Sequence, residues 1–297
     1  MSSIAPFRLD RRAVERSFGQ ASGCYAAAAH RPVRVGGELL ERLQFFDLQP
    51  RVILDLGCAV GSAARQLRKR FPRARVIALD LAYLMAREAR RRQRFWRRFD
   101  CVCADARALP LAAHSVDLVF SNLMLHWCDD PAALFSQVQA ALRPGGLMLF
   151  STFGPDTLRE LRAAWACADT ASHVSAFADM TQLAAAMTHC GLSEPVMDRE
   201  LELAHYPDAR ALMNELRTLG ARHAASDRRR TLTGRGRLQA MLNAYEQART
   251  GAGLPASWEI IYGAGFAGAP RSDGAATLSP GEFTVPISAI RSPGKST

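Results

Sequence analysis

The chain has 297 residues, of which 48% are hydrophobic and 22% are charged. That composition is ordinary for a folded globular protein, and it excludes a disordered or collagen-like chain. The 38 Lys and Arg residues outnumber the 28 Asp and Glu residues, so the formal net charge at pH 7 is +10. This excess of positive charge indicates an acidic partner, either a nucleic acid or an acidic protein, without distinguishing between them.

The sequence pattern favours a protein that stays in the cytoplasm. Residues 1–18 lack the apolar core of a secretory signal peptide. The longest apolar stretch, at about 118–128, is interrupted by polar residues and is too short to span a bilayer. The seven cysteines are odd in number and scattered, which favours small buried side chains over disulfides or a metal site. We therefore expect a cytoplasmic protein without a bound metal.

Residues 51–152 alternate apolar runs of strand length with helical patterns. The strand-like runs are 51–56, 75–79, 101–104, 116–121 and 146–152, and the helical patterns are 62–71, 82–98 and 131–142. Runs that are apolar on both faces are typical of strands buried between two layers of helices. The alternation therefore predicts an α/β fold with a parallel sheet.

Beyond residue 152 the alternation gives way to helices followed by more distant strands. Helices are predicted at about 155–168 and 181–190, and strands at 196–203 and 258–262. Two more predicted helices, at 207–219 and 235–249, lie between those strands. We interpret residues 204–250 as a helical insertion that forms a lid over the site. Residues 267–297 are interpreted as a low-complexity tail with a candidate edge strand at 283–290.

A glycine-containing turn, DLGCAVG at residues 55–61, directly follows the first predicted strand and opens a helix. Glycines at such a turn tolerate positive φ and let a ligand approach the backbone closely. The spacing differs from G-x-G-x-x-G, which argues against a standard NAD site. A tight turn without a ligand is the alternative at this point.

Two further acids follow the next predicted strands. Asp80 ends the second strand, where a carboxylate can bind both hydroxyls of a ribose, and Asp105 follows the third. Ligands bind at the carboxyl edge of the sheet in open α/β folds. Either acid alone would be explained as a strand-end cap or a solvated charge. Together with Asp55 they place three acids at successive strand ends, which indicates a ligand site.

Five motifs in this order resemble those of class I S-adenosylmethionine-dependent methyltransferases. They are DLGCAVG at 55–61, LD at 79–80, ADARALP at 104–110, VDLVFSN at 116–122 and LRPGG at 142–146. The resemblance covers residues 51–152. It implies a Rossmann-like, mostly parallel seven-stranded sheet with helices on both faces, and S-adenosyl-L-methionine as the methyl donor.

The same resemblance implies a set of cofactor-binding residues at the strand ends. It places Asp55, Gly57, Cys58 and Gly61 beside the methionine part, Asp80 with the neighbouring Leu81 at the ribose, Asp105 with Ala106 at the adenine, and Asn122 with Leu123 near the sulfonium.

Further motifs narrow the resemblance to the malonyl-[acyl-carrier-protein] O-methyltransferases of biotin biosynthesis, over residues 14–290. These motifs are ERSFGQASGCY, FSNLMLHWCDDP, STFGPDTLRELR, HVSAFADM, ELRTLGAR and LTGRGRLQAMLNAYE. The match implies that residues 1–45 form a helical segment over the cofactor and bring Tyr25 to its methionine end. It also implies that residues 46–266 form the methyltransferase domain.

The sequence departs from that family at four places. Ala59 replaces a usual glycine, which is a mild change if the local φ is negative, and Ala26 replaces a usual acid. Pro32 stands where the family often has glutamine, and Ala264–Phe266 (AGF) differs from the more usual HAW. We expect the changes at 26 and 32 to affect donor contacts and the last change to affect acceptor recognition.

The implied reaction transfers a methyl group to the free carboxylate of a malonyl group on an acidic acyl-carrier protein. A carboxyl group with a pKa of about 4 is ionised at neutral pH, so it needs no general base. Arg159 and Arg162 are candidate ligands for this carboxylate, because a guanidinium binds it bidentately, although both also fit solvated surface positions. Trp127 is a candidate pocket wall or core residue. Tyr25 and His126 are the candidate catalytic residues.

Two clusters of arginines are candidate docking surfaces for the carrier. They lie at 87–98 and 228–237. The alternative for the first is a solvated helix face with arginine stems on Phe95 and Trp96. The runner-up function is a methyltransferase of a quinone or another small molecule. Residues 121–124 (SNLM) lack the Asn-Pro-Pro-Tyr type of motif used on flipped bases, which disfavours methylation of a nucleic-acid base. We expect neither a nucleic acid nor a membrane as partner.

Overall fold

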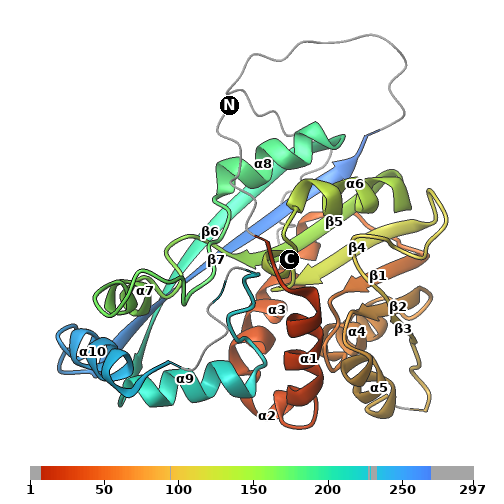
Figure 1. Cartoon of the computed structure of the whole chain (residues 1–297). Coiled ribbons are helices and arrows are strands. Elements are labelled where there is room, and N and C mark those ends of the chain that lie inside the picture. Colours follow the sequence, from red (N-terminus) through yellow and green to blue (C-terminus); the bar gives the residue numbers. More distant parts are fainter. Residues whose placement is uncertain (1–7, 94, 227, 229–232, 269–297) are drawn as a thin grey trace, which may run out of the picture.

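Seven strands form one sheet in the part of the chain that the computed structural model describes, residues 8–93, 95–226, 228 and 233–268 (Figure 1). They are β1 (Val52–Leu56), β2 (Arg75–Asp80), β3 (Asp100–Cys103), β4 (Val116–Asn122), β5 (Leu142–Phe153), β6 (Leu192–Tyr206) and β7 (Leu254–Ala267). Their order is β3-β2-β1-β4-β5-β7-β6. Neighbours from β3 to β5 are parallel, and β7 is antiparallel to both β5 and β6. The predicted mostly parallel seven-stranded sheet is confirmed, while the edge strand predicted at 283–290 lies outside the described residues.

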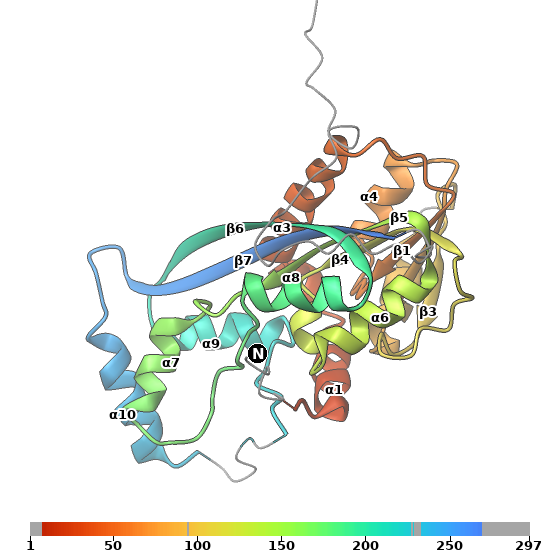
Figure 2. The ribbon, with the colours of Figure 1, turned by 90° about the horizontal axis from the view of Figure 1, so that it is seen from above.

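Helices cover both faces of the sheet (Figure 2). On one face lie α3 (His30–Arg42) and α4 (Ser62–Arg70), whose apolar side chains share a core with β1, β4 and β5. On the other face α6 (Pro131–Ala141) and α8 (Met180–His189) form a second core with the same strands. Leu54, Leu118 and Val119 are completely buried, because each lies under one of these two layers.

Residues 82–98 were expected to form one long helix, and this expectation is wrong. The helix α5 (Tyr83–Arg91) packs on β2 and β3 and ends at Arg91. Phe99 is buried beside the Gly61 turn, so the chain must leave the helix early to bring this ring into the core. The exposed Phe95 and Trp96 therefore belong to a loop, where the Arg98 guanidinium lies 4.9 Å from the Phe95 ring.

The pair formed by β6 and β7 extends beyond the rest of the sheet. The ladder between β5 and β7 ends where Phe153 faces Ile260, whereas β6 and β7 stay paired as far as Tyr206 and Leu254. The chain between these strands contains α9 (Ala209–Thr218) and α10 (Arg235–Glu246), within the predicted insertion. Figure 1 shows both helices with α7 (Arg159–Ala166) beside the free end of this strand pair. The extension builds a helical platform next to the carboxyl edge of the parallel strands.

The N-terminal helices are α1 (Arg11–Ala21) and α2 (Tyr25–Ala28), followed by α3. Asp10 caps α1 by accepting from the backbone N–H of Ala13 at 3.1 Å. Leu9 forms a β-bridge with Ala225, which ties the start of α1 to the segment after α9. None of the helices in the described residues is long and apolar enough to cross a membrane.

Candidate active site

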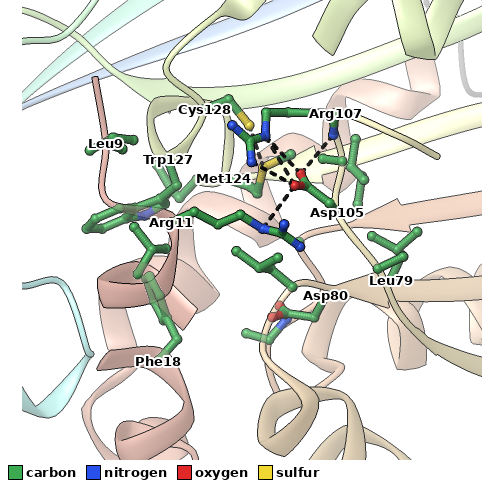
Figure 3. Close-up of a pocket in the computed structure, with 18 of the residues that line it drawn as sticks. Leu9, Arg11, Phe18, Leu79, Asp80, Asp105, Arg107, Met124, Trp127 and Cys128 are labelled. Atoms are coloured by element: carbon green, nitrogen blue, oxygen red, sulfur yellow. Dashed lines mark hydrogen bonds and ion pairs between the residues drawn. The ribbon is translucent and has the colours of Figure 1, made fainter. Parts of the chain in front are cut away.

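A first cavity lies at the carboxyl ends of β1, β2 and β4, under helix α1 (Figure 3). Eight of the predicted cofactor-binding residues lie in its wall, seven of them at or just after the ends of parallel strands and one on α2. They are Tyr25, Gly57, Asp80, Leu81, Asp105, Ala106, Asn122 and Leu123. The predicted residues Asp55, Cys58 and Gly61 do not line it.

Gly57 and Gly61 of the turn are required for different structural reasons. Gly57 has a φ of +80°, and a Cβ there would collide with the Met124 side chain in the wall of the first cavity. Gly61 has a φ of +75°, and its Cβ would lie 3.0 Å from both Ala89 and Phe99. Gly57 therefore shapes the cavity, whereas Gly61 permits close packing of the turn against the neighbouring helix.

Ala59 adopts a backbone conformation that disfavours its side chain. Its φ is +45°, so the condition under which this departure from the family would be mild, a negative φ, is not met. The turn is held in this shape because the Ala59 N–H donates to the Asp80 carboxylate at 2.9 Å. Left-handed backbone at a non-glycine residue stores strain of about 1 kcal/mol.

Asp80 is the acid that best fits a ligand with hydroxyl groups. Its Oδ1 accepts from the N–H of Ala82 at 2.8 Å and its Oδ2 accepts from the N–H of Ala59. Each carboxylate oxygen has a second lone pair for a further donor from the first cavity, such as a ribose hydroxyl. Burial raises its pKa to about 6, so the group is mostly ionised at neutral pH.

Asp55 is buried behind the turn instead of facing the first cavity. Its side chain is 1% exposed, and its Oδ2 has no hydrogen-bond partner among the described residues. Burial is the main cause that raises its pKa to about 7, and the nearby charge of Asp80 adds to the effect. Cys58 is also buried, and the pKa of its thiol is raised for the same reason.

Asp105 already has cationic partners in this structure. It accepts from Arg107 at 2.9 Å and forms an ion pair with Arg11 of α1 at 3.0 Å (Figure 3). These hydrogen bonds and charges hold the pKa of Asp105 below its usual value despite its partial burial. Both arginines line the first cavity, and the sequence analysis missed them. Arg107 is two residues from Asp105 and was within reach of that analysis, whereas nothing local links Arg11 to this site.

A second cavity, with a volume of ≈ 320 Å³, lies beside the first under α7, α9 and the segment after α9. Four residues line both cavities and mark their junction. They are Phe18, Tyr25, Leu123 and Trp127. Leu123 has a φ of +50° and is held in this shape by its N–H, which donates to the Ser151 carbonyl at 3.0 Å. A ligand in the first cavity and a ligand in the second can therefore contact each other at this junction.

His126 and Trp127 stand near that junction on a short 3₁₀ turn, Leu125–Trp127. Trp127 packs edge to face against Phe18, with ring centroids 5.0 Å apart, so two aromatic rings form part of the wall at the junction. His126 lies 4.7 Å from the Phe153 ring, and its Nδ1 is 3.3 Å from the Thr152 hydroxyl. Burial lowers the pKa of His126 to about 3, so this imidazole is neutral at pH 7.

The predicted acceptor ligands Arg159 and Arg162 do not line the second cavity. Arg159 pairs with its neighbour Glu160 at 3.2 Å, and Arg162 donates to the carbonyl oxygens of Pro155 and Thr157 at 3.0 Å. Both side chains therefore have partners on or beside α7. Their assignment as acceptor ligands stays a prediction, and the lining of the second cavity does not support it.

Arg31 lines the second cavity and was missed by the sequence analysis. It is 4% exposed, with its guanidinium 3.9 Å from the Trp258 ring. It donates to Glu215 at 2.7 Å and to Glu202 at 3.2 Å, so its charge is fully balanced. The attraction of these two carboxylates therefore offsets the desolvation free energy of the buried guanidinium group.

The other departures from the family lie at different distances from the cavities. Pro32 lines the second cavity, and its carbonyl accepts from the Asn122 amide at 2.8 Å. Ala26 is exposed on α2. Ala264–Phe266 lies inside β7, paired with β5 and β6, and lines neither cavity. This last change therefore does not alter the wall of either cavity, and its effect on acceptor recognition stays a prediction.

Comparison with known proteins supports both the fold and the family. A family model described as a methyltransferase domain matches residues 54–150. A putative methyltransferase from Bacillus halodurans is 14% identical, with a TM-score of 0.56, and the alignment covers 78% of this chain and 100% of that one. A putative methyltransferase from Haloferax volcanii, solved with its Trm112 activator, gives 19% identity and a TM-score of 0.54 over 87% of this chain and 99% of that one. These two similarities show the fold.

Relatives of higher identity show the family. A malonyl-[acyl-carrier protein] O-methyltransferase of Xylella fastidiosa is 44% identical over 93% of this chain and 94% of its own length. One of Gallionella capsiferriformans is 39% identical over 92% of this chain and 97% of its own length. Because similarity of this degree extends over both cavities and the platform of helices beside them, the chain is an enzyme that belongs to the malonyl-[acyl-carrier protein] O-methyltransferase family.

Proposed function

We propose that this enzyme transfers the methyl group of S-adenosyl-L-methionine to the free carboxylate of malonyl-acyl-carrier protein. The product is the malonyl methyl ester that primes pimeloyl synthesis for biotin. The observation that carries this proposal is the pair of cavities that meet at Tyr25, Leu123 and Trp127, in a chain whose relatives carry this activity in their names. A small-molecule methyltransferase is the alternative that the experiment below tests.

The first cavity would hold the donor, which supplies a methyl group on a positively charged sulfur. Asp80 would bind the ribose hydroxyls, and Gly57 leaves room for the chain of the cofactor. Tyr25 would stand at the methyl end, where burial and the charge of Asp80 raise its pKa and keep the hydroxyl protonated. A protonated Tyr25 can donate a hydrogen bond but cannot act as a base.

This arrangement suits a reaction that needs no proton transfer. The acceptor carboxylate is ionised at neutral pH, and His126 is neutral there, so neither has to exchange a proton. The residues at the junction would instead hold the carboxylate oxygen in line with the methyl group and exclude water. Partners of the enzyme would then be an acidic carrier protein, with no nucleic acid or membrane, in the cytoplasm.

The donor site is tested with Asp80→Ala. Loss of charge-assisted hydrogen bonds, each worth roughly 1.5–3 kcal/mol, should lower donor affinity at least tenfold in calorimetry. The far-UV circular dichroism spectrum should stay native. Unchanged affinity in the folded variant would remove Asp80 from the donor site.

The whole proposal is tested by incubating the enzyme with isotopically labelled donor and malonyl-carrier protein, followed by intact mass analysis. One labelled methyl group should appear on malonyl-carrier protein, with at least a hundredfold preference over acetyl-carrier protein, which has no free carboxylate. The gene should also restore growth without biotin to a strain that lacks its own enzyme. Methylation of neither acyl group, with failed rescue, would favour a small-molecule acceptor.

A further inference from the structure

The second cavity changes in character from its junction to its rim. Near the junction its wall is aromatic, with Trp127, Phe153 and Phe177 around the neutral His126. Arg217 and Arg222 line the same cavity, at the end of α9 and just after it. Among the described residues that line this cavity, these two are the ones exposed to solvent. They therefore mark the rim through which an acceptor would enter.

Among the described residues, the structure pairs neither of these two arginines with an acidic side chain. Within the described part of the chain, neither guanidinium has a carboxylate within ion-pair distance, in contrast to Arg31 deeper in the cavity. The loop between them carries no acidic residue, since it reads Thr218-Leu219-Gly220-Ala221. Two unpaired guanidinium groups on one rim attract an anion that can receive several hydrogen bonds at once.

We propose that Arg217 and Arg222 form a subsite for the phosphate of the prosthetic arm that carries the acyl group. This proposal rests on the proposed function, in which the acceptor is a thioester on a carrier protein. Such a thioester is attached through a long pantetheine chain that ends in a phosphodiester. With the malonyl carboxylate at the junction, the thioester and the arm extend toward the rim. The phosphate then follows the acyl group into the mouth of the second cavity.

This subsite differs from the docking surface that the sequence suggested at 87–98. The arginines on α5 line neither cavity, so they cannot contact the arm inside the second cavity. Arg210 offers a matched control, because it is an exposed arginine on the same helix as Arg217 and does not line the cavity. Since Arg210, Arg217 and Arg222 are all exposed, their replacement by Gln should leave the melting temperature unchanged.

The experiment compares three malonyl thioesters with the double variant Arg217→Gln/Arg222→Gln, the Arg210→Gln control and the unmodified enzyme. The thioesters are those of pantetheine, of phosphopantetheine and of the carrier protein. For the double variant, KM should rise at least about tenfold with phosphopantetheine and with the carrier, because hydrogen bonds to the charged phosphate are lost. KM with pantetheine and kcat with all three should stay within twofold, roughly the scatter of surface substitutions.

A binding measurement separates this proposal from the proposed reaction. Calorimetry should show phosphopantetheine binding at least about tenfold more tightly than pantetheine to the unmodified enzyme, and this gain should vanish in the double variant. A loss confined to the carrier protein would assign the arginines to acidic side chains of the carrier and overturn the proposal. An equal loss on all three thioesters, or no loss, would overturn it as well. An unmodified enzyme that methylates none of them would instead refute the proposed function.

Discussion

At the scale of single residues, the sequence places an alanine, Ala59, at a position of the site where the backbone is left-handed and strained. Glycine adopts left-handed backbone with little strain, whereas alanine does so at a cost in conformational energy. The hydrogen bond from the Ala59 N–H to Asp80 nevertheless requires this left-handed backbone. Ala59→Gly should therefore raise the free energy of unfolding by about 0.5–1 kcal/mol, measured by urea denaturation. The matched change Ala26→Gly lies in helix α2 and should lower that free energy by a similar amount. A destabilised Ala59→Gly protein would contradict the strain argument.

His126 allows a prediction about pH at the same scale. Its folded-state pKa of about 3 lies below the usual value of 6.5, so below pH 6.5 the unfolded state binds the proton and the folded state does not. The stability that His126 contributes should thus fall as pH drops from 6.5, by at most about 1.4 kcal/mol per pH unit.

Asp55 and Asp80 have the opposite effect, because their raised pKa values favour the folded state as the pH falls from 7 toward 4. The useful quantity is therefore the difference in unfolding free energy between the unmodified protein and His126→Phe. As the pH falls from 6.5 to 4.5, the unmodified protein should lose unfolding free energy relative to His126→Phe. A difference that is independent of pH would show that His126 is protonated equally in both states.

At the scale of elements, helix α1 is tied across the first cavity by the ion pair between Arg11 and Asp105. Arg11 is 51% exposed, and such pairs are worth up to about 1 kcal/mol. Arg11→Gln should speed donor dissociation roughly two- to fivefold in stopped-flow measurements, corresponding to that energy. Arg12→Gln, on the next exposed position of the same helix, should not. Equal rates in both variants would mean that α1 does not gate the first cavity.

The length of strands β6 and β7 decides which segments reach the second cavity. Short strands were predicted at 196–203 and 258–262, whereas the structure extends them to Leu192–Tyr206 and Leu254–Ala267. The additional pairs carry α9 to the second cavity, and α10 packs against α7 and α9 beside it. Exposed residues alternate with half-buried ones along most of β6, which fits a strand that is covered on one face only. This pattern is a weaker signal than the apolar runs of the central strands.

At the scale of the whole molecule, the net charge of +10 should guide an acidic partner before any contact forms. Arg87 and Arg91 are exposed on α5, away from both cavities. The double reversal Arg87→Glu/Arg91→Glu should slow association with the carrier protein and flatten its dependence on salt.

Turnover of a free malonyl thioester should be unchanged by the same reversal, since no residue of either cavity is altered. Association rates over a range of ionic strengths provide the measurement. An equal loss of activity on the carrier and on the free thioester would show instead that these arginines stabilise the fold.

The sequence by itself determined the parallel core and the position of Asp80 and Gly57 at its carboxyl edge. These features follow from short-range patterns, because apolar runs report burial and parallel strands must end at the same edge. The tertiary structure alone decided which cations face the second cavity. Arg159 does not line that cavity, whereas Arg31 and Arg217, which are far apart in the sequence, both do. Such positions depend on packing between distant segments, and no local periodicity encodes them.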